Sequence, residues 1–300
     1  MEVIMKDRKP SFTAEVAASL RAMESLRPEH ERVCYDPLAR IFISNRLQIL
    51  ARISPLVKIL YWYLSKRRLD VVMYLNEAAL RTRYIDDYLN ECFHRGIEQL
   101  VILGAGFDSR AYRFNELKGM IKVFEVDHPA TQRVKIERLK KVFASLPDHV
   151  VYVPIDFNKE KLDKRLFESG YNASLKTLFI WETVTMYLTA EAVDETLACV
   201  ANNSGEGSSI YFDYISQSFL DGTSELVELR KMREGTPIDE PFTFAIEEGT
   251  IDEFLSSRGF YQVENVTAED LKNAYFKGKN QGRKVAGWCN FVHATVKPRG

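Results

Sequence analysis

The sequence has few cysteines and no excess of charge of either sign. Its cysteines are scattered over 300 residues without a CxxC pair, at Cys34, Cys92, Cys199 and Cys289. This spacing excludes a zinc ribbon or a disulfide scaffold and is typical of a reducing compartment. Lys and Arg number 41 against 42 Asp and Glu, a formal net charge of −1. The chain therefore lacks the basic excess of proteins that bind duplex nucleic acid, and we expect no nucleic-acid partner.

Long apolar runs are also missing. The first residues, MEVIMKDRKPSF, contain no apolar segment of the kind found in secretory signals. The most apolar stretch, residues 56–64, is too short to span a bilayer and contains Lys58. We therefore expect a cytoplasmic protein without stable membrane insertion. What is present is a hydrophobic fraction of 46%, which is enough for a sizeable core and excludes a disordered chain.

The first hundred residues carry helical patterns. Apolar residues recur at helical spacing behind two candidate N-caps, Ser11 and Thr13, and Asp36-Pro37 predicts a second helix over residues 36–50. A longer pattern from Asp70 to His94 ends before Gly96, a residue typical of helix ends. We expect residues 1–96 to form an N-terminal helical cap.

After residue 96, short apolar runs alternate with helical patterns. The helical patterns predict helices over residues 129–146, from Asn158 to Gly170, over 189–201 and over 246–258. The predicted strands cover residues 99–103, 121–126, 150–155, 177–181, 208–214, 260–266 and 288–296. Strands that alternate with helices favour a parallel sheet with right-handed crossovers. The linker before the last strand is too short for a helical crossover, so we expect that strand to be antiparallel. The predicted fold is α/β, with its core over residues 97–300 and a substrate-side insertion at 215–246.

A glycine turn follows the first predicted strand. Gly104-Ala105-Gly106 comes directly after residues 99–103, and glycine there lets the backbone pass close beneath a ligand. Asp127 ends the next strand, 23 residues after Gly104. An acid about 20 residues beyond such a turn accepts hydrogen bonds from ribose hydroxyls. Because ligands bind at the carboxyl ends of strands in open α/β sheets, the pattern predicts an adenosine-type site.

The turn lacks features that phosphate-binding sites need. Ser109 stands where a dinucleotide-binding GxGxxG motif has its third glycine, and there is no P-loop lysine pattern. A site that need not hold phosphates fits S-adenosylmethionine, whose tail is a zwitterionic amino acid. Two other interpretations stay open: a nicotinamide oxidoreductase that uses the same turn and acid, and a non-catalytic nucleotide-binding or regulatory protein. A tight turn with an acid on the surface is the structural alternative.

Four motifs carry a resemblance to a known family. LGAGFDSRAYRF (103–114), FEVDHP (124–129), VPIDF (153–157) and FIWETVTMYLT (179–189) together resemble the leucine carboxyl methyltransferase family. YFKGKNQGRKVA (275–286) resembles its bacterial, polyketide carboxyl O-methyltransferase-like members. The resemblance covers about residues 14–296. It implies an S-adenosylmethionine-dependent O-methyltransferase with the Rossmann-like sheet of class I methyltransferases and an N-terminal helical cap.

The resemblance also implies roles for individual residues. Positions that match the family's cofactor site are Arg81, Gly104, Ala105, Gly106, Asp127, Asp156, Phe157 and Glu182. The glycine turn would lie beneath the cofactor, Asp127 would hold the ribose, and Asp156 and Phe157 would flank the adenine. Glu182 would lie near the cofactor's amino group, and Arg81 would bind its carboxylate. The structural alternatives are a solvated helix arginine at Arg81 and a helix cap at Asp156.

The acceptor is expected to be a carboxylate. A carboxylate is already ionised at neutral pH and needs no general base, whereas a phenol or alcohol needs one, and no histidine in the sequence suits that role. Donors that would hold the acceptor are Arg21, Arg113 and Tyr187. Arg21 stands where the protein-phosphatase members of the family have a lysine, which changes the geometry. The alternatives are a structural ion pair for Arg113 and a core role for Tyr187. None of the five histidines has metal-ligand spacing, so we predict no metal.

The predicted activity is the formation of a methyl ester on a small hydrophobic acid, polyketide- or acyl-like, with S-adenosylhomocysteine as the second product. Residues 56–64 and 215–244 are rich in aromatic and aliphatic side chains, and we expect them to select the acceptor. Whether residues 56–64 form a lid, a membrane-facing surface or part of the core stays open. Methylation of a protein C-terminal carboxylate is the alternative within the same class.

Overall fold

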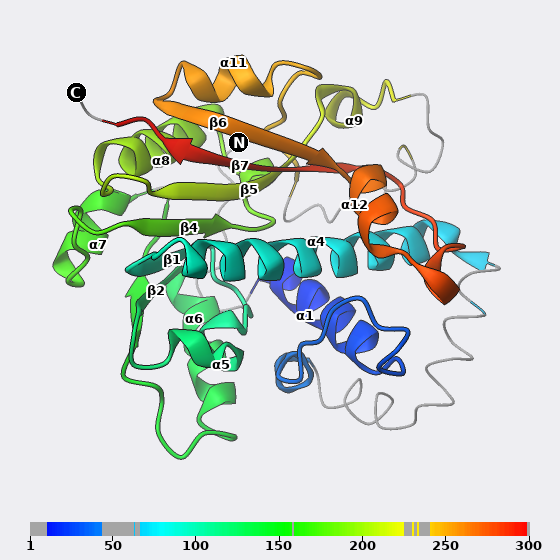
Figure 1. The fold of residues 1–300 in the computed structure, drawn as a ribbon, viewed down its shortest axis with the longest axis horizontal. Coiled ribbons are helices and arrows are strands. Elements are labelled where there is room, and N and C mark those ends of the chain that lie inside the picture. Colours follow the sequence, from blue (N-terminus) through cyan, green and yellow to red (C-terminus); the bar gives the residue numbers. More distant parts are fainter. Residues whose placement is uncertain are drawn as a thin grey trace.

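A seven-stranded sheet forms the centre of the protein (Figure 1). The computed structural model describes residues 11–43, 63, 67–157, 159–224, 230, 233 and 241–298, and within them the strand order is β3-β2-β1-β4-β5-β7-β6. The strands are β1 (Gln99–Leu103), β2 (Lys122–Asp127), β3 (Val150–Pro154), β4 (Thr177–Trp181), β5 (Ser209–Ile215), β6 (Phe260–Thr267) and β7 (Cys289–Val296). The first five pair in parallel, and β7 is antiparallel to both β5 and β6. The predicted α/β class and the antiparallel last strand are confirmed.

Helices cover both faces of this sheet (Figure 1). They are α1 (Phe12–Ser25), α4 (Leu69–His94), α5 (Arg110–Arg113), α6 (Pro129–Leu139), α7 (Leu162–Glu168), α8 (Ala190–Asn202), α9 (Gln217–Asp221), α11 (Ile251–Ser256) and α12 (Ala268–Tyr275). Short 3₁₀ turns are η1 (Ala39–Phe42), η2 (Asn115–Leu117), η3 (Thr185–Tyr187) and η4 (Gly278–Asn280).

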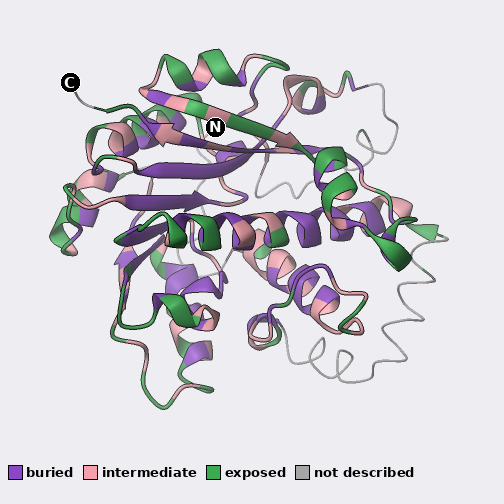
Figure 2. Cartoon of the chain, viewed as in Figure 1, coloured by how far each residue is buried: buried purple, intermediate pink, exposed green. Residues whose placement is uncertain are grey.

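Each face of the sheet has its own core, because successive strand residues point to opposite faces. Leu100 and Ile102 of β1 pack into a core shared with α1, α4, α5 and α12. Val101 and Leu103 pack into a second core shared with α7, α8 and α11. Figure 2 shows the inner strands buried along their length and exposed residues on the outer sides of the covering helices.

Helices α1 and α4 pack against each other. Leu20 of α1 contacts Leu75 and Ala78 of α4 in a small buried cluster. The side chain of Ser11 accepts a hydrogen bond from the backbone N–H of Ala14, so Ser11 caps α1 as predicted. Helix α4 ends at His94, two residues before Gly96 with its φ of 76°. The sequence therefore predicted the start of α1 and the end of α4.

Two predicted helices are shorter in the structure. The helix expected over residues 246–258 is reduced to α11, because the backbone N–H of Ile246 donates to the carbonyl of Ile215 and residue 246 forms a β-bridge with Ser216. The helix expected to reach Leu146 ends at Leu139, and Phe143 and Leu146 beyond it pack against the core.

Two further local predictions also differ from the structure. The start of the helix expected after Asp36 is the 3₁₀ turn η1, whose Phe42 stacks on Phe107 with ring centroids 5.2 Å apart. Helix α12 was not predicted. Thr267 and Asp270 form a capping box at its start, and the eight-residue helix fits into the linker without a crossover.

Several predicted segments lie outside the described residues. They are residues 44–50 of the second predicted helix, residues 56–64 apart from Tyr63, the helix start at Asn158, and residues 225–240 of the predicted insertion apart from Arg230 and Arg233. Within the described part of the chain, no helix combines the length and the apolar character needed to cross a membrane.

Candidate active site

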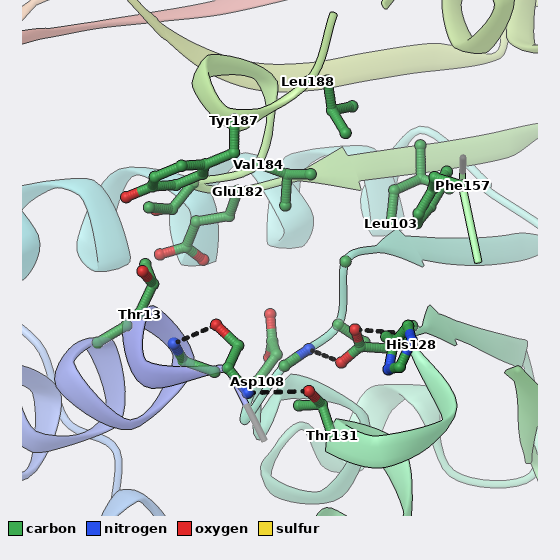
Figure 3. Close-up of a pocket in the computed structure, with 18 of the residues that line it drawn as sticks. Thr13, Leu103, Asp108, His128, Thr131, Phe157, Glu182, Val184, Tyr187 and Leu188 are labelled. Carbon is green, nitrogen blue, oxygen red and sulfur yellow. Dashed lines mark hydrogen bonds between the residues drawn. The ribbon is translucent and has the colours of Figure 1, made fainter. Parts of the chain in front are cut away.

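A cavity of about 570 Å³ lies at the carboxyl ends of the parallel strands. Its wall combines α1, the glycine turn after β1, the end of β2, the segments after β3 and β4, and the chain near Pro241. Figure 3 shows Glu182, Val184 and Tyr187 along one side and Asp108, Thr131 and His128 along the other. The predicted site residues among those that line it are Arg21, Gly104, Ala105, Gly106, Asp127, Asp156, Phe157, Glu182 and Tyr187.

The glycine turn needs glycine for two reasons. Gly104 and Gly106 have φ angles of 63° and 44°, a region that residues with a Cβ rarely adopt. A Cβ on Gly104 would also lie 2.3 Å from Cγ2 of Val184, and one on Gly106 would lie 3.2 Å from Cβ of Ala14. From the sequence we attributed the need for glycine to a ligand that passes close to the turn. In the structure, Val184 and Ala14 already restrict the space for a Cβ at these two positions.

Asp127 is fixed at the end of β2 by the backbone. Its Oδ2 accepts a hydrogen bond from the N–H of Gly106, and its Oδ1 accepts one from the N–H of His128, both at 2.7 Å. Burial raises the pKa of Asp127 to about 6, although these hydrogen bonds and the charge of Lys135 favour the carboxylate. A carboxylate has about four acceptor sites. Two are used by the backbone, so Asp127 can also accept from hydroxyl groups in the cavity.

A buried cation supports the glycine turn from below. The Nζ of Lys135 lies 2.8 Å from Oε1 of Glu125 and 3.5 Å from the carbonyl oxygen of Ala105. The hydroxyl of Tyr112 donates to the other oxygen of Glu125 at 2.9 Å. Since both charged groups are paired, this network holds the turn without leaving an uncompensated charge beneath the cavity.

Glu182 follows β4 and is held between two guanidinium groups. Nε of Arg81 donates to its Oε1, and Nη1 of Arg110 donates to its Oε2, both at 2.8 Å. Burial opposes the charge on Glu182, but Arg110 and Arg81 outweigh it and hold the pKa of this carboxyl well below its usual range. Glu182 is therefore ionised at neutral pH and is a weak base.

Arg81 and Arg113 are absent from the cavity wall that the described residues form. Arg81 is buried, and its Nη1 lies 3.5 Å from Oδ2 of Asp213 in addition to its bond with Glu182. Nη2 of Arg113 pairs with Oδ1 of Asp86 at 2.5 Å, as in the ion-pair alternative. The structure thus places both arginines behind the site rather than in it.

Among the described residues, Arg21 is the arginine that lines the cavity. Its Nε pairs with Oδ2 of Asp36 at 2.9 Å, and its Nη2 donates to the carbonyl oxygen of Phe107 at 2.6 Å. Only 6% of Arg21 is exposed, and its Nη1 has no hydrogen-bond partner among the described residues. A buried guanidinium that lines a cavity with a free N–H group suits an anionic ligand.

The wall around Tyr187 is held together by the backbone. The N–H of Thr243 donates to the carbonyl oxygen of Met186 at 2.8 Å. The hydroxyl of Thr243 donates to the carbonyl oxygen of Leu188, also at 2.8 Å. The rings of Tyr187 and Phe242 lie 5.3 Å apart. Pro241 and Thr243, near the end of the predicted insertion, line the cavity.

Asp156 and Phe157 lie together after β3. Both line the cavity, with Ile155 and Leu103 beside them. Oδ2 of Asp156 lies 2.8 Å from Nζ of Lys159, and its backbone carbonyl accepts the N–H groups of Lys159 and Glu160. The structure thus brings a carboxylate and an aromatic ring to one end of the cavity.

The sequence interpretation missed most of the α1 wall. Ala14, Ala17 and Arg21 lie at positions i, i+3 and i+7, so they share one face of the helix, and all three line the cavity. Leu20 belongs to a different face, which packs on α4. The small residues on this face were visible in the sequence, and small residues on a helix allow a neighbouring segment or ligand to come close. The sequence did not show that this face of α1 lines a cavity.

The model of the leucine carboxyl methyltransferase family matches residues 14–201. The chain belongs to the leucine carboxyl methyltransferase family. The resemblance seen in the motifs is thereby confirmed, and family membership favours the methyltransferase interpretation over a nicotinamide oxidoreductase.

Two bacterial relatives carry methyltransferase names, and one solved structure has a similar fold. A Bacillus subtilis protein with the provisional name S-adenosyl-L-methionine-dependent methyltransferase YktD is 32% identical over 222 residues, which cover 72% of this chain and 71% of that protein. A Streptomyces coelicolor protein with a name of the same kind, SCO7813, is 33% identical over 65% of this chain and 66% of its own. A structure provisionally named a methyltransferase, from Thermobifida fusca, superposes with a TM-score of 0.59 over 97% of this chain and 96% of its own. At 12% identity, that likeness shows the fold alone.

The described residues contain no group of three or more His, Cys, Asp or Glu side chains arranged to hold a metal ion. His128, which lines the cavity, accepts a hydrogen bond from the N–H of Ala130 through its Nδ1 at 3.3 Å and so caps α6.

Proposed function

We propose that this chain, an S-adenosylmethionine-dependent methyltransferase of the leucine carboxyl methyltransferase family, methylates the carboxylate of a small hydrophobic acid. The products would be a methyl ester and S-adenosylhomocysteine. The observation that carries the proposal is the buried guanidinium of Arg21, which lines the cavity and whose Nη1 has no hydrogen-bond partner among the described residues.

The residues of the cavity fit the cofactor. Asp127 has acceptor sites left for ribose hydroxyls, and Asp156 and Phe157 would flank the adenine. Glu182, ionised at neutral pH, would accept from an ammonium group. When bound, S-adenosylmethionine supplies a methyl group on a positively charged sulfur.

The protein's own contribution is to hold and orient the acceptor. Arg21 would bind the acceptor carboxylate through Nη1, and the hydroxyl of Tyr187 would donate to the same group. Helix α1 and the chain around Thr243 would exclude water from the cavity. Because an ionised carboxylate needs no base, the weak basicity of Glu182 suits this reaction and does not suit a phenol or alcohol acceptor.

Arg81 and Arg113 act from behind the wall in this proposal. Arg81 would fix Glu182 at the cavity, and Arg113 would fix Asp86, which in turn accepts from Nε of Arg110 at 2.9 Å. Their roles as direct ligands, implied by the family resemblance and the donor chemistry, would require both side chains to leave these ion pairs.

The test is a product screen. Purified protein would be incubated with S-adenosylmethionine and a panel of aliphatic and arylalkanoic acids, with the matching alcohols and amides as controls, and methyl esters identified by mass spectrometry. We expect esters of apolar acids only, and Arg21→Gln should abolish their formation while S-adenosylhomocysteine still binds. Methylation of peptide C-termini alone, or of the alcohols, would refute the proposed acceptor.

A further inference from the structure

A further buried ion pair joins the segment that precedes β7 to α1. Arg283 donates from Nη1 to Oε1 and from Nη2 to Oε2 of Glu24, both at 2.8 Å, and from Nε to Oδ1 of Asn76, also at 2.8 Å. Glu24 is fully buried and Arg283 is 7% exposed. A bidentate pair with a third hydrogen bond uses the guanidinium fork in a geometry that a lysine cannot reproduce.

This guanidinium joins three parts of the chain. Glu24 is on the last turn of α1, and its Oε1 also accepts the N–H of Val33 at 2.9 Å. Asn76 is on α4, and its side-chain amide donates to the carbonyl oxygen of Lys284 at 2.7 Å. Next to Arg283, the amide of Asn280 donates to the carbonyl oxygen of Glu31 at 2.9 Å. Residues 280–284 are thereby fastened to both N-terminal helices.

The position of α1 matters because this helix forms one wall of the cavity. Ala14 lies so close to the glycine turn that a Cβ on Gly106 would be 3.2 Å from its own Cβ. The first turn of α1 is held by the N–H of Ser11, which donates to Oγ1 of Thr131 at 3.1 Å, and by Glu15, which pairs with Arg138 at 3.0 Å. Neither contact holds the last turn.

The carboxyl-terminal half of α1 carries Arg21, the residue of the cavity wall that has to be positioned. Arg21 and Glu24 are three residues apart, and so lie on adjacent turns of one helix face. Arg21 has its own contacts with Asp36 and Phe107, but both belong to segments outside the strands of the sheet. The bond from Arg283 to Glu24 connects this end of α1 to the chain that leads into β7.

We infer that Arg283 is a positioning residue for the cavity: through Glu24 it fixes α1, and with it the wall formed by Ala14, Ala17 and Arg21, against the glycine turn. The inference rests on the proposed function for its catalytic consequence. It also gives a role to the motif at residues 275–286, which takes no part in lining the cavity.

The test compares Arg283→Lys and Glu24→Gln with Val296→Ala. Glu24→Gln leaves the bonds of Arg283 to Asn76 and Asn280 in place, so it serves as the milder variant. Val296 is buried at the end of β7, beside the amino end of β5 and so at the end of the sheet opposite the cavity. Its truncation should lower stability without affecting α1. Amide hydrogen exchange over residues 12–25 and calorimetric titration with S-adenosylhomocysteine would be measured well below each melting temperature.

We expect both variants of the pair to lose exchange protection in α1 and to bind S-adenosylhomocysteine more weakly, by roughly tenfold for Arg283→Lys. Val296→Ala should do neither. Unchanged protection of α1 in Arg283→Lys, or lost protection with unchanged affinity, would overturn the inference. Failure of the unaltered protein to bind the nucleoside would instead refute the proposed function, and the exchange data would still decide whether Arg283 fixes α1.

Discussion

Nε of Arg81 donates a hydrogen bond to Oε1 of Glu182 across 2.8 Å and so joins the middle of α4 to the end of β4. Glu182 faces the cavity and Arg81 does not. The arginine that the family resemblance pointed to as a cofactor ligand is therefore placed to hold the carboxylate that lines the site, and its removal should affect stability as well as binding.

Replacement of Arg81 by methionine should destabilise the fold by about 3–5 kcal/mol, because buried Asp213 would lose its guanidinium partner and Glu182 would keep only Arg110. Urea unfolding would measure the change. Arg83→Met is the matched control: Arg83 is two residues along the same helix, half-exposed, and paired only with Asp87 among the described acids, so its loss should cost under about 1 kcal/mol. Equal losses in the two variants would contradict the assignment.

Binding of S-adenosylhomocysteine should weaken as the pH falls below about 6. The pKa of Asp127 is raised from 3.8 to about 6, so its carboxylate is fully ionised above neutrality and takes up a proton as the pH falls through that value. A protonated carboxyl has fewer acceptor sites for ribose hydroxyls. Calorimetric titrations would be run from about pH 5 to about pH 8, which brackets this pKa. They should show weaker binding at low pH for the unaltered protein and an affinity independent of pH for Asp127→Asn. A pH dependence that persists in Asp127→Asn would assign the titration to another group.

In the free protein, the same raised pKa has the opposite consequence for stability: a fall in pH strengthens the fold although it weakens binding. The folded state of Asp127 binds its proton more tightly than the unfolded state does, so this group stabilises the fold as the pH falls from about 6 towards 4. Loss of binding below pH 6 is therefore not expected to come from unfolding caused by Asp127, and a melting curve at each pH separates the two effects.

Gly104→Ala should destabilise the protein by about 2–5 kcal/mol, the sum of an unfavourable positive φ and a clash with Val184. Gly249→Ala isolates the first contribution, since Gly249 has a φ of 79° with nothing within 4 Å of its added Cβ. The double variant Gly104→Ala/Val184→Ala removes the clash and should regain part of the loss. Thermal unfolding that ranks Gly104→Ala no lower than Gly249→Ala would show that the turn tolerates a side chain.

Tyr187→Phe should lower kcat/KM for the acceptor acid by roughly tenfold or more, the loss of one hydrogen bond to a charged group, and leave affinity for S-adenosylhomocysteine unchanged. Tyr171→Phe is the control, because its hydroxyl donates to the carbonyl oxygen of Asn203 at 2.7 Å, away from the cavity. An unaltered kcat/KM in Tyr187→Phe would assign this tyrosine to packing against Phe242.

The parts of the fold with strong local signals were predictable from the sequence. Residues 99–103 and 177–181 are continuous apolar runs in the middle of the sheet, and both strands have the predicted bounds. The glycine turn and Asp127 were predictable for the same reason, since the turn directly follows β1 and Asp127 is the last residue of β2. At Ile246, by contrast, the local pattern predicted a helix, but the backbone pairs with Ser216, so the helix begins only at Ile251.

The orientation of side chains on long helices was not predictable. Arg21 and Arg81 are both arginines on helices with apolar faces, yet one lines the cavity and the other lies behind Glu182. That difference depends on how α1 and α4 pack against the sheet, which in turn depends on contacts such as the one between Arg283 and Glu24, 259 residues apart in the sequence. No local pattern records such a pair.

The central claim is that the cavity beside Asp127 binds an adenosylated amino acid. Calorimetric titration of the purified protein with S-adenosylhomocysteine, alongside NADH and the variant Asp127→Ala, tests it most directly. We expect micromolar binding of S-adenosylhomocysteine, its loss in Asp127→Ala, and no heat with NADH. Well-folded protein that binds neither compound, or that binds S-adenosylhomocysteine equally well without Asp127, would contradict it.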